Sequence, residues 1–185
     1  MIAVFDVESS CTELSDLDPA SPSQPYVCAV AAALYDEDRE IMSAQLIVRP
    51  DGWKIAADMT AIHGITTERA SEVGISIQAA LAAIVGITAN APTLVCFGLS
   101  YNERRIQAEL ARLKRTTIWP HAGQDRVCVM ALATDACKIP HPKREGQFKL
   151  PKLSEASRII LGQEHAGDCL ADARAAYAIY RKLAA

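Results

Sequence analysis

The stretch that most constrains the fold is Met1–Glu8, which reads MIAVFDVE. Five apolar residues come first, followed by two carboxylates, Asp6 and Glu8, with Val7 between them. A short apolar run of this kind is typical of a buried strand. Residues two apart on a strand project from the same side. The sequence therefore predicts two neighbouring carboxylates at the end of the first strand.

Other apolar runs predict the rest of the sheet. Tyr26–Tyr35 and Ile41–Val48 are separated by a turn at 36–39, and together with the first run they predict an antiparallel β-meander. Thr93–Leu99 predicts a further strand. Val127–Ala136 is apolar and either begins as a strand or is helical throughout.

Helical spacing of apolar residues predicts the helices, and two polar stretches predict loops. The predicted helices are Ile55–His63, Ile75–Ile84, Tyr101–Lys114, Lys152–Leu161 and Leu170–Leu183. Residues 12–25, rich in Pro and Ser, and the basic residues 138–152 predict surface loops. This order of elements favours an α/β fold, a mixed sheet flanked by helices, in a single domain spanning residues 1–185. Ligands in such sheets bind at the carboxyl ends of strands, where Asp6 and Glu8 are expected.

Charge and composition exclude some classes of protein. The net charge of −3 argues against a protein that coats nucleic acid through a general basic surface. Two basic clusters, within 104–115 and 138–152, are most simply read as solvated surface. The six cysteines form no CxxC pair, which favours reduced thiols in a cytoplasmic protein. The sequence shows no signal peptide and no apolar stretch long enough to span a membrane.

The acidic residues suggest a metal site. Asp6 and Glu8 repel each other unless a cation compensates, and oxygen ligands suit Mg²⁺ or Mn²⁺. The alternative is an exposed strand end before a turn. On the last helix, Asp168 is placed to cap the N-terminus, whereas Asp172 lies too far inside the helix to do so. Asp172 is therefore either functional or an exposed acid paired with a neighbour such as Arg174.

Several motifs together resemble the DEDD (DnaQ-like) 3′–5′ exonucleases, in particular the short, stand-alone type of bacteria and phages. The segment 5–10, FDVESS, resembles the first motif of that family, and 59–66, MTAIHGIT, resembles the stretch that follows its third strand. Leu94–Leu110 and Leu150–Leu183 are similar in layout to the second and third motifs. The resemblance covers the whole chain and implies an RNase H-like fold with a mixed five-stranded sheet.

The resemblance also implies a metal-dependent 3′–5′ exonuclease that hydrolyses phosphodiester bonds. Asp6, Glu8 and Asp172 would hold two divalent ions, Mg²⁺ or Mn²⁺, that activate a water and stabilise the leaving 3′ oxygen. The residues implied at the terminal nucleotide are Ser9, Ser10, Met59, Ile62 and His63. For Met59 and Ile62 the alternative is helix core. For His63 it is a hydrogen bond at the helix C-terminus.

Two departures from the family pattern bear on activity. The second motif reads FGLSYN at 97–102, so Asn102 stands where the family has an acid, and a neutral ligand weakens a second metal site. Gly167 stands where the family has the histidine that serves as general base. His165, two residues earlier, reaches the site if its loop folds inward; otherwise it is an exposed loop residue.

Two classes of function therefore remain open. One is an exonuclease, active or with impaired catalysis, that acts on single-stranded nucleic acid or 3′ ends, with DNA preferred to RNA and with a replication or repair polymerase as its partner. The other is a degenerate exonuclease fold that binds nucleic acid or protein. A general nucleotide-binding domain lacks support, because the sequence contains no GxGxxG and no GxxxxGK[ST]. A cysteine hydrolase is disfavoured because no cysteine has an activating context.

Overall fold

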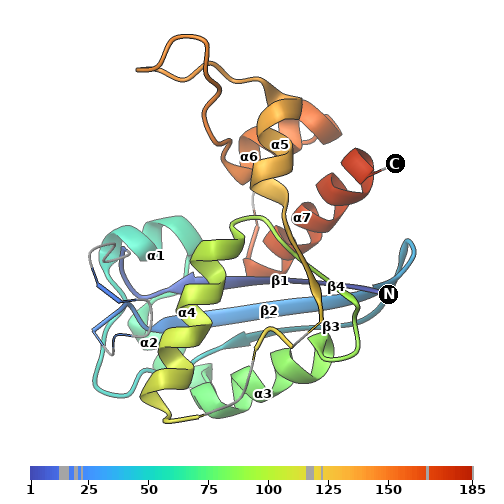
Figure 1. Cartoon of the computed structure of the whole chain (residues 1–185). Coiled ribbons are helices and arrows are strands. Elements are labelled where there is room, and N and C mark those ends of the chain that lie inside the picture. Colours follow the sequence, from blue (N-terminus) through green and yellow to red (C-terminus); the bar gives the residue numbers. More distant parts are fainter. Residues whose placement is uncertain are drawn as a thin grey trace.

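The computed structural model describes residues 1–12, 17, 18, 21, 23–115, 119–121, 123–165 and 167–184 (Figure 1). Part of the predicted loop at 12–25 lies outside these residues. Five strands form one sheet in the order β3-β2-β1-β4-β5. Their bounds are β1 Ile2–Ser9, β2 Val27–Asp36, β3 Arg39–Ile47, β4 Thr93–Cys96 and β5 Asp125–Cys128.

The direction of the strands confirms the predicted mixed sheet and the β-meander. β2 runs antiparallel to both β1 and β3, and β4 and β5 run parallel to β1 and to each other. β2 is buried over nearly its whole length, as its continuous apolar sequence requires. β1 is paired with β2 from Ile2 to Ser9 and with β4 over Ile2–Val4, so Asp6 and Glu8 are held in the sheet by their pairing with β2.

Helices cover both faces of the sheet (Figure 1). Their bounds are α1 Ala57–His63, α2 Thr67–Val73, α3 Ile77–Thr88, α4 Leu99–Arg112, α5 Val129–Cys137, α6 Leu153–Ala156, the π-helical turn η1 Ser157–Leu161, and α7 Cys169–Ala184. One face packs on α3 and α4, with Phe5, Ile84 and Ile106 in its core. The other face packs on α5, α6 and α7, with Val4, Ala133 and Ile179 in its core.

The alternation of β1 directs its carboxylates to one layer. Ala3, Phe5 and Val7 belong to the core beneath α3 and α4, whereas Val4 belongs to the core beneath α7. Asp6 and Glu8 continue the row of Val4, because every second residue of a strand shares a face. The two acids are therefore aimed towards the layer that contains α7.

Several predicted boundaries need correction. The strand predicted over Thr93–Leu99 ends at Cys96, because Leu99 already begins α4. Val127–Ala136 is divided between β5 and α5, which settles the choice left open by its composition. The helix predicted over Lys152–Leu161 is α6 followed by the π-helical turn.

Helix α2 was not predicted. It is short and polar and has Ala70 as its buried residue, so it shows no apolar periodicity. Its signal is local: the side chain of Thr66 caps the helix by accepting a hydrogen bond from the backbone N–H of Arg69.

The cysteines agree with the prediction of reduced thiols. All six are free, and Cys28, Cys96 and Cys169 are buried. Among the described residues, no helix is both long and apolar enough to cross a membrane.

Candidate active site

Acidic side chains from opposite ends of the chain meet at the carboxyl end of β1. Asp6 and Glu8 come from β1, and Asp172 lies in the first turn of α7. Ligand atoms of Asp6, Glu8 and Cys169 all lie within 4.8 Å of one another. The negative charge of Asp172 acts on both Asp6 and Glu8. Asp172 is not one of the residues whose ligand atoms lie within 4.8 Å of one another, but it lies near enough for its charge to act on both acids of the strand.

The electrostatics of this cluster favour a bound cation. Burial, together with the charges of Glu8 and Asp172, raises the pKa of Asp6 well above its usual value. Burial and the charge of Asp172 raise the pKa of Glu8 to about 7. Burial also raises the pKa of Asp172, against the lowering effect of His165. The contacts that lower the pKa of Asp6 come from neutral donors, so its charge is not balanced by a basic side chain.

Asn102 lies directly beside Asp6. Its side-chain Nδ2 is 3.2 Å from Asp6 Oδ1, 3.0 Å from Cys96 Sγ and 3.3 Å from the carbonyl oxygen of Gly98. The residue is buried, and its Oδ1 has no hydrogen-bond partner among the described residues. Asn102 therefore occupies the predicted position, where it donates a hydrogen bond to a carboxylate and leaves one oxygen unsatisfied.

Cys169 belongs to the site although it was not among the residues proposed from the sequence. Its Sγ donates a hydrogen bond to Asp6 Oδ2 across 3.6 Å. Burial and the charges of the acids, Asp6 first, raise the pKa of this thiol well above its usual value, so it stays protonated. The donor set available to a metal is then carboxylate oxygen, which fits Mg²⁺ or Mn²⁺. The sequence does contain one signal for Cys169: it precedes Asp172 by three residues, so the two side chains lie on the same side of a helix.

The loop before α7 folds inward and brings His165 to the acids. His165 Nε2 lies 2.6 Å from Asp172 Oδ1. Asp168 caps the helix as predicted, because its Oδ1 accepts the backbone N–H of Ala171 at 3.0 Å. The alternative in which Asp172 pairs with Arg174 is wrong: Arg174 binds Glu40 through two hydrogen bonds of 2.7 and 2.8 Å.

Gly167 is held at close quarters by the same helix. A Cβ atom built at this position would lie 2.4 Å from the Cβ of Ala171. Such an approach is too short for two carbon atoms, so a side chain at 167 requires movement of α7 or of the loop. The glycine is therefore a packing requirement of this backbone.

Ser9 and Ser10 stand next to the acids at the end of β1. Ser9 Oγ donates to the carbonyl oxygen of Cys11 at 3.0 Å and lies 2.7 Å from the hydroxyl of Tyr101. Ser10 Oγ accepts the backbone N–H of Tyr26 at 3.0 Å. Both serines are buried. Their hydroxyls hold the end of β1 against α4 and β2.

His63 connects α1 to the same strand end. Its Nδ1 accepts the backbone N–H of Ile65 at 3.1 Å, and its Nε2 lies 3.3 Å from the carbonyl oxygen of Ser9. Burial lowers the pKa of His63, which favours a neutral ring with the proton on Nε2. Nε2 then donates to Ser9. The predicted alternative, a hydrogen bond to the last carbonyls of the helix, is not the arrangement observed.

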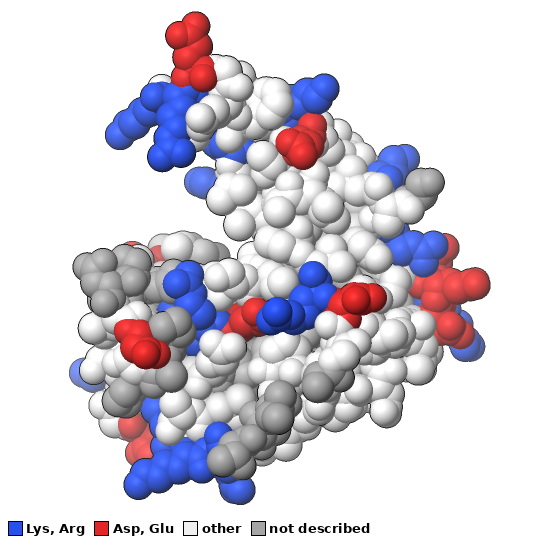
Figure 2. Space-filling model, in the orientation of Figure 1, with Lys and Arg blue, Asp and Glu red and all other residues white. Residues whose placement is uncertain are grey.

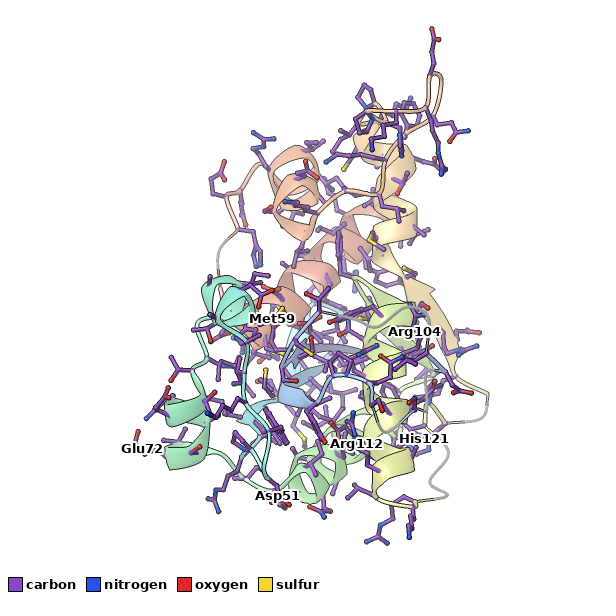
Figure 3. The ribbon with its side chains drawn as sticks, turned by 90° about the vertical axis from the view of Figure 1, so that its left-hand side faces the viewer. Asp51, Met59, Glu72, Arg104, Arg112 and His121 are labelled. Atoms are coloured by element: carbon purple, nitrogen blue, oxygen red, sulfur yellow. The ribbon has the colours of Figure 1, made fainter. Side chains whose placement is uncertain are left out.

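Met59 and Ile62 occupy different environments on α1. Met59 is buried in a small core with Cys28, Ile55 and Ala70, which agrees with the alternative that this side chain belongs to the helix core. Ile62 is 73% exposed, so it is not part of the helix core and does not line an enclosed pocket. In Figure 3, Met59 marks the side of the molecule where α1 faces the start of α7.

Comparison with solved structures identifies proteins of the same fold. Exonuclease I from Methylocaldum szegediense matches with a TM-score of 0.70 and 19% identity. The match covers 98% of this chain and 40% of the exonuclease I chain. A zinc-bound complex of E. coli exonuclease I with single-stranded DNA matches with a TM-score of 0.70 and 18% identity. The match covers 98% of this chain and 40% of the exonuclease I chain. The nuclease domain of 3′hExo, a DEDDh family member bound to rAMP, matches with a TM-score of 0.71 and 15% identity. The match covers 99% of this chain and 90% of that domain.

These matches define the fold. The chain spans about two fifths of the length of the exonuclease I chains, and most of the 3′hExo nuclease domain. No protein-family model matches the sequence, and a search of curated proteins finds no match. At identities below one fifth, the similarity establishes a DEDD-type exonuclease fold with an RNase H-like sheet.

Proposed function

We propose that this chain is a divalent-metal-dependent 3′–5′ exonuclease domain that spans residues 1–185 and hydrolyses phosphodiester bonds at nucleic acid 3′ ends. The observation that carries the proposal is the pair of acids Asp6 and Glu8 at the end of β1, on both of which the charge of Asp172 acts, within the fold of DEDD exonucleases. Three partly buried carboxylates whose charges act on one another are unfavourable without a cation.

Each acid has a role in this proposal. Asp6, Glu8 and Asp172 hold Mg²⁺ or Mn²⁺, and Asn102 contributes its unsatisfied Oδ1 as a weaker, neutral ligand. Bound divalent ions supply an activated water and neutralise the charge that develops on the leaving 3′ oxygen. Cys169 keeps the Asp6 carboxylate in place through its hydrogen bond. Because Asn102 replaces an acid, this site has less negative charge than the family pattern and a weaker second ion.

His165 is the proposed general base. Its Nε2 faces Asp172, so the carboxylate that would hold the metal also orients the imidazole. In this role Nε2 of the ring would accept a proton from the attacking water. This function is fulfilled from a loop position two residues before that of the family histidine.

The terminal nucleotide is proposed to lie over Ser9, Ser10, Met59, Ile62 and His63. Ser9 and Ser10 present the backbone at the end of β1, and His63 fixes that backbone through its hydrogen bond to Ser9. Met59 supports α1 from within the core, and the exposed side chain of Ile62 offers an apolar contact from the helix surface. The substrate is proposed to be single-stranded, with DNA preferred to RNA. A cytoplasmic location and a replication or repair polymerase partner stay predictions.

A second candidate is a degenerate exonuclease fold that binds nucleic acid or protein without efficient hydrolysis. Two observations favour it. Asn102 donates to Asp6 Oδ1, so one oxygen of the central carboxylate is already engaged. His165 engages an oxygen of Asp172 in the same way. Both contacts reduce the number of oxygens that are ready for a metal.

Digestion of a 5′-labelled single strand separates the two candidates. DNA and RNA oligonucleotides are incubated in Mg²⁺ and in Mn²⁺ with wild-type protein and with Asp6→Asn, which preserves shape and removes charge. A ladder that shortens from the 3′ end in the wild type alone supports the exonuclease. Intact oligonucleotide in both metals, with protein that circular dichroism shows to be folded, contradicts the proposed activity and favours the binding role.

A further inference from the structure

The segment between α5 and α6 forms an ordered projection, here called the basic arm and defined as residues 138–150. It begins at Lys138, which ends α5 in a left-handed conformation. Its two sides are joined by backbone hydrogen bonds from Lys149 to Ile139 (2.9 Å) and from His141 to Gln147 (2.8 Å). The arm is thus a hairpin-like structure that holds its side chains in defined positions.

The arm is basic in a chain that is acidic as a whole. It carries Lys138, Lys143, Arg144 and Lys149 against one acid, Glu145, whereas the net charge of the chain is −3. Within the described part of the chain, its salt bridge is the one from Lys149 to Glu155. Lys143 and Arg144 are exposed and find no carboxylate partner there. Uncompensated cations fixed on one projection favour an external anion.

The arm also exposes apolar side chains among its cations. Phe148 is 43% exposed, although the other two phenylalanines, Phe5 and Phe97, pack in the cores of the sheet. The bridge between Pro140 and Phe148 fixes the backbone of this aromatic residue. Leu150 is 59% exposed two residues later. Cations interleaved with an exposed aromatic ring form the surface on which proteins hold single-stranded nucleic acid.

The position of the arm agrees with that chemistry. In Figure 1 the arm extends above α1, on the side of the sheet where β1 ends. Figure 2 shows the surface hollowed between the arm and the body of the molecule, with Lys and Arg gathered at the tip of the arm. Figure 3 looks onto this side and shows the arm at the upper right, beyond the end of α5, with Met59 on α1 lower and to the left.

We propose that the basic arm holds the single strand on the 5′ side of the bound 3′ end, with Lys143 and Arg144 on phosphates and Phe148 against a base. The inference rests on the proposed exonuclease function for the direction of the strand. It adds a binding surface to the acidic site and names its ligand, single-stranded nucleic acid rather than an acidic protein.

The chain offers a matched control for the test. Lys143-Arg144 and Lys114-Arg115 are both exposed Lys-Arg pairs, and the second follows α4 at the opposite end of the molecule (Figure 1). Replacing either pair by alanine removes the same charge. Any difference between the two double variants therefore reports position and not net charge.

Binding is measured by fluorescence anisotropy of labelled dT20 and dT4 in EDTA, where a metal-dependent nuclease does not digest the probe. We expect Lys143→Ala/Arg144→Ala to weaken dT20 binding and to reduce the slope of log K against log salt by about 1.4, from about 0.7 per lost phosphate contact. Phe148→Ala should weaken dT20 binding by about 5-fold or more through lost stacking. The Lys114→Ala/Arg115→Ala variant should bind dT20 within about twofold of wild type, and dT4 should respond little to any variant.

Three outcomes would overturn the inference: equal effects of the two double variants, equal effects on dT20 and dT4, or no effect of the arm variants at all. The last would assign the arm to another kind of partner. Failure of the exonuclease proposal reads differently, because dT20 then stays intact in Mn²⁺ while the anisotropy assay still reports on the arm. All the substituted side chains are exposed, so unchanged melting temperatures serve as the folding control.

Discussion

Two regions of the molecule contribute to one site and differ in how firmly they are placed. Asp6 and Glu8 leave β1, which is hydrogen-bonded to β2 on one side and β4 on the other. Asn102 and His165 come instead from the start of α4 and from the loop before α7. The strand carries two of the proposed metal-binding acids, whereas the two departures proposed from the sequence, Asn102 and Gly167, belong to the second region.

The difference has a physical origin. A residue on a paired strand cannot shift by one position without reversing its face, so its chemistry is either retained or lost. A helix start or loop can reach the same point from another residue, as His165 does from two positions before Gly167. Departures from the family pattern are therefore expected to be severe on β1 and graded on the helical side.

The largest expected effect is on the strand. Glu8→Gln should reduce nuclease activity by more than about 100-fold. Losing a residue that hydrogen-bonds to a metal ligand costs about 10–100-fold, and losing the ligand itself costs more. The folded state of this variant without metal should be more stable than wild type, since one of three repelling charges is gone. Single-turnover digestion and thermal melting measure the two effects, and Glu72→Gln on the surface of α2 is the control. Retained activity would remove Glu8 from the metal site.

His165→Ala tests the loop. We expect a loss of about 100-fold or more in single-turnover rate, the lower end of what a general base contributes. The rise in melting temperature on adding Mn²⁺ should persist, because the three carboxylates remain. A variant with wild-type rate would show that His165 only fills space beside Asp172. A variant that loses the Mn²⁺ effect would show that it positions the metal ligand.

Asn102→Asp should sharpen the contrast between the regions. The substitution removes the hydrogen bond to Asp6 and adds a fourth carboxylate, so the metal-free protein should melt lower. The concentration of Mg²⁺ needed for half-maximal activity should fall by about tenfold. This is the lower end of the change in metal affinity caused by one residue that hydrogen-bonds to a metal ligand. An unchanged metal requirement would mean that position 102 does not contact the ion. Asn102→Ala, which also loses the hydrogen bond, separates this effect from the added charge.

Gly167→His places the family histidine at its usual position and is expected to destabilise the fold. The new Cβ would overlap Ala171, and overpacking of this kind costs about 1–3 kcal/mol. Gly167→His combined with Ala171→Gly should recover part of this loss, and any gain in activity should appear in the double variant. Urea denaturation of both variants measures it. Equal stability of the single variant and wild type would show that the loop moves freely.

The last prediction concerns the pH dependence of stability without metal. Folding raises the pKa of Glu8 from 4.5 to about 7, so the folded state binds the proton more tightly than the unfolded state. Stability should therefore fall as pH rises from about 4.5 through about 7, and Glu8→Gln should flatten that fall. Melting curves in EDTA across this range provide the measurement. A stability that rises through the same range in wild type, but not in Glu8→Gln, would contradict the shift.

Much of the fold was predictable because its signals are local. The apolar runs around Val4, Val30 and Val95 predicted strands, and the spacing of Ile106 and Leu110 predicted α4. Helix α2 escaped because it buries little more than Ala70. The end of β4 at Cys96 was predicted too late because apolar residues continue into the start of α4. These residues are apolar because α4 packs on the sheet, not because they pair as a strand.

The sequence by itself determined most of the elements, the mixed sheet and the placing of Asp6 and Glu8 on one side of a strand, since alternation on β1 and the capping of α7 by Asp168 are properties of neighbouring residues. Only the tertiary structure decided that Asp6 and Asp172 meet, that His165 turns inward, that Cys169 donates to Asp6, and that Ile62 stays exposed. These facts depend on contacts between residues far apart in the chain. No local pattern encodes such contacts, because they arise only when the sheet and α7 pack together.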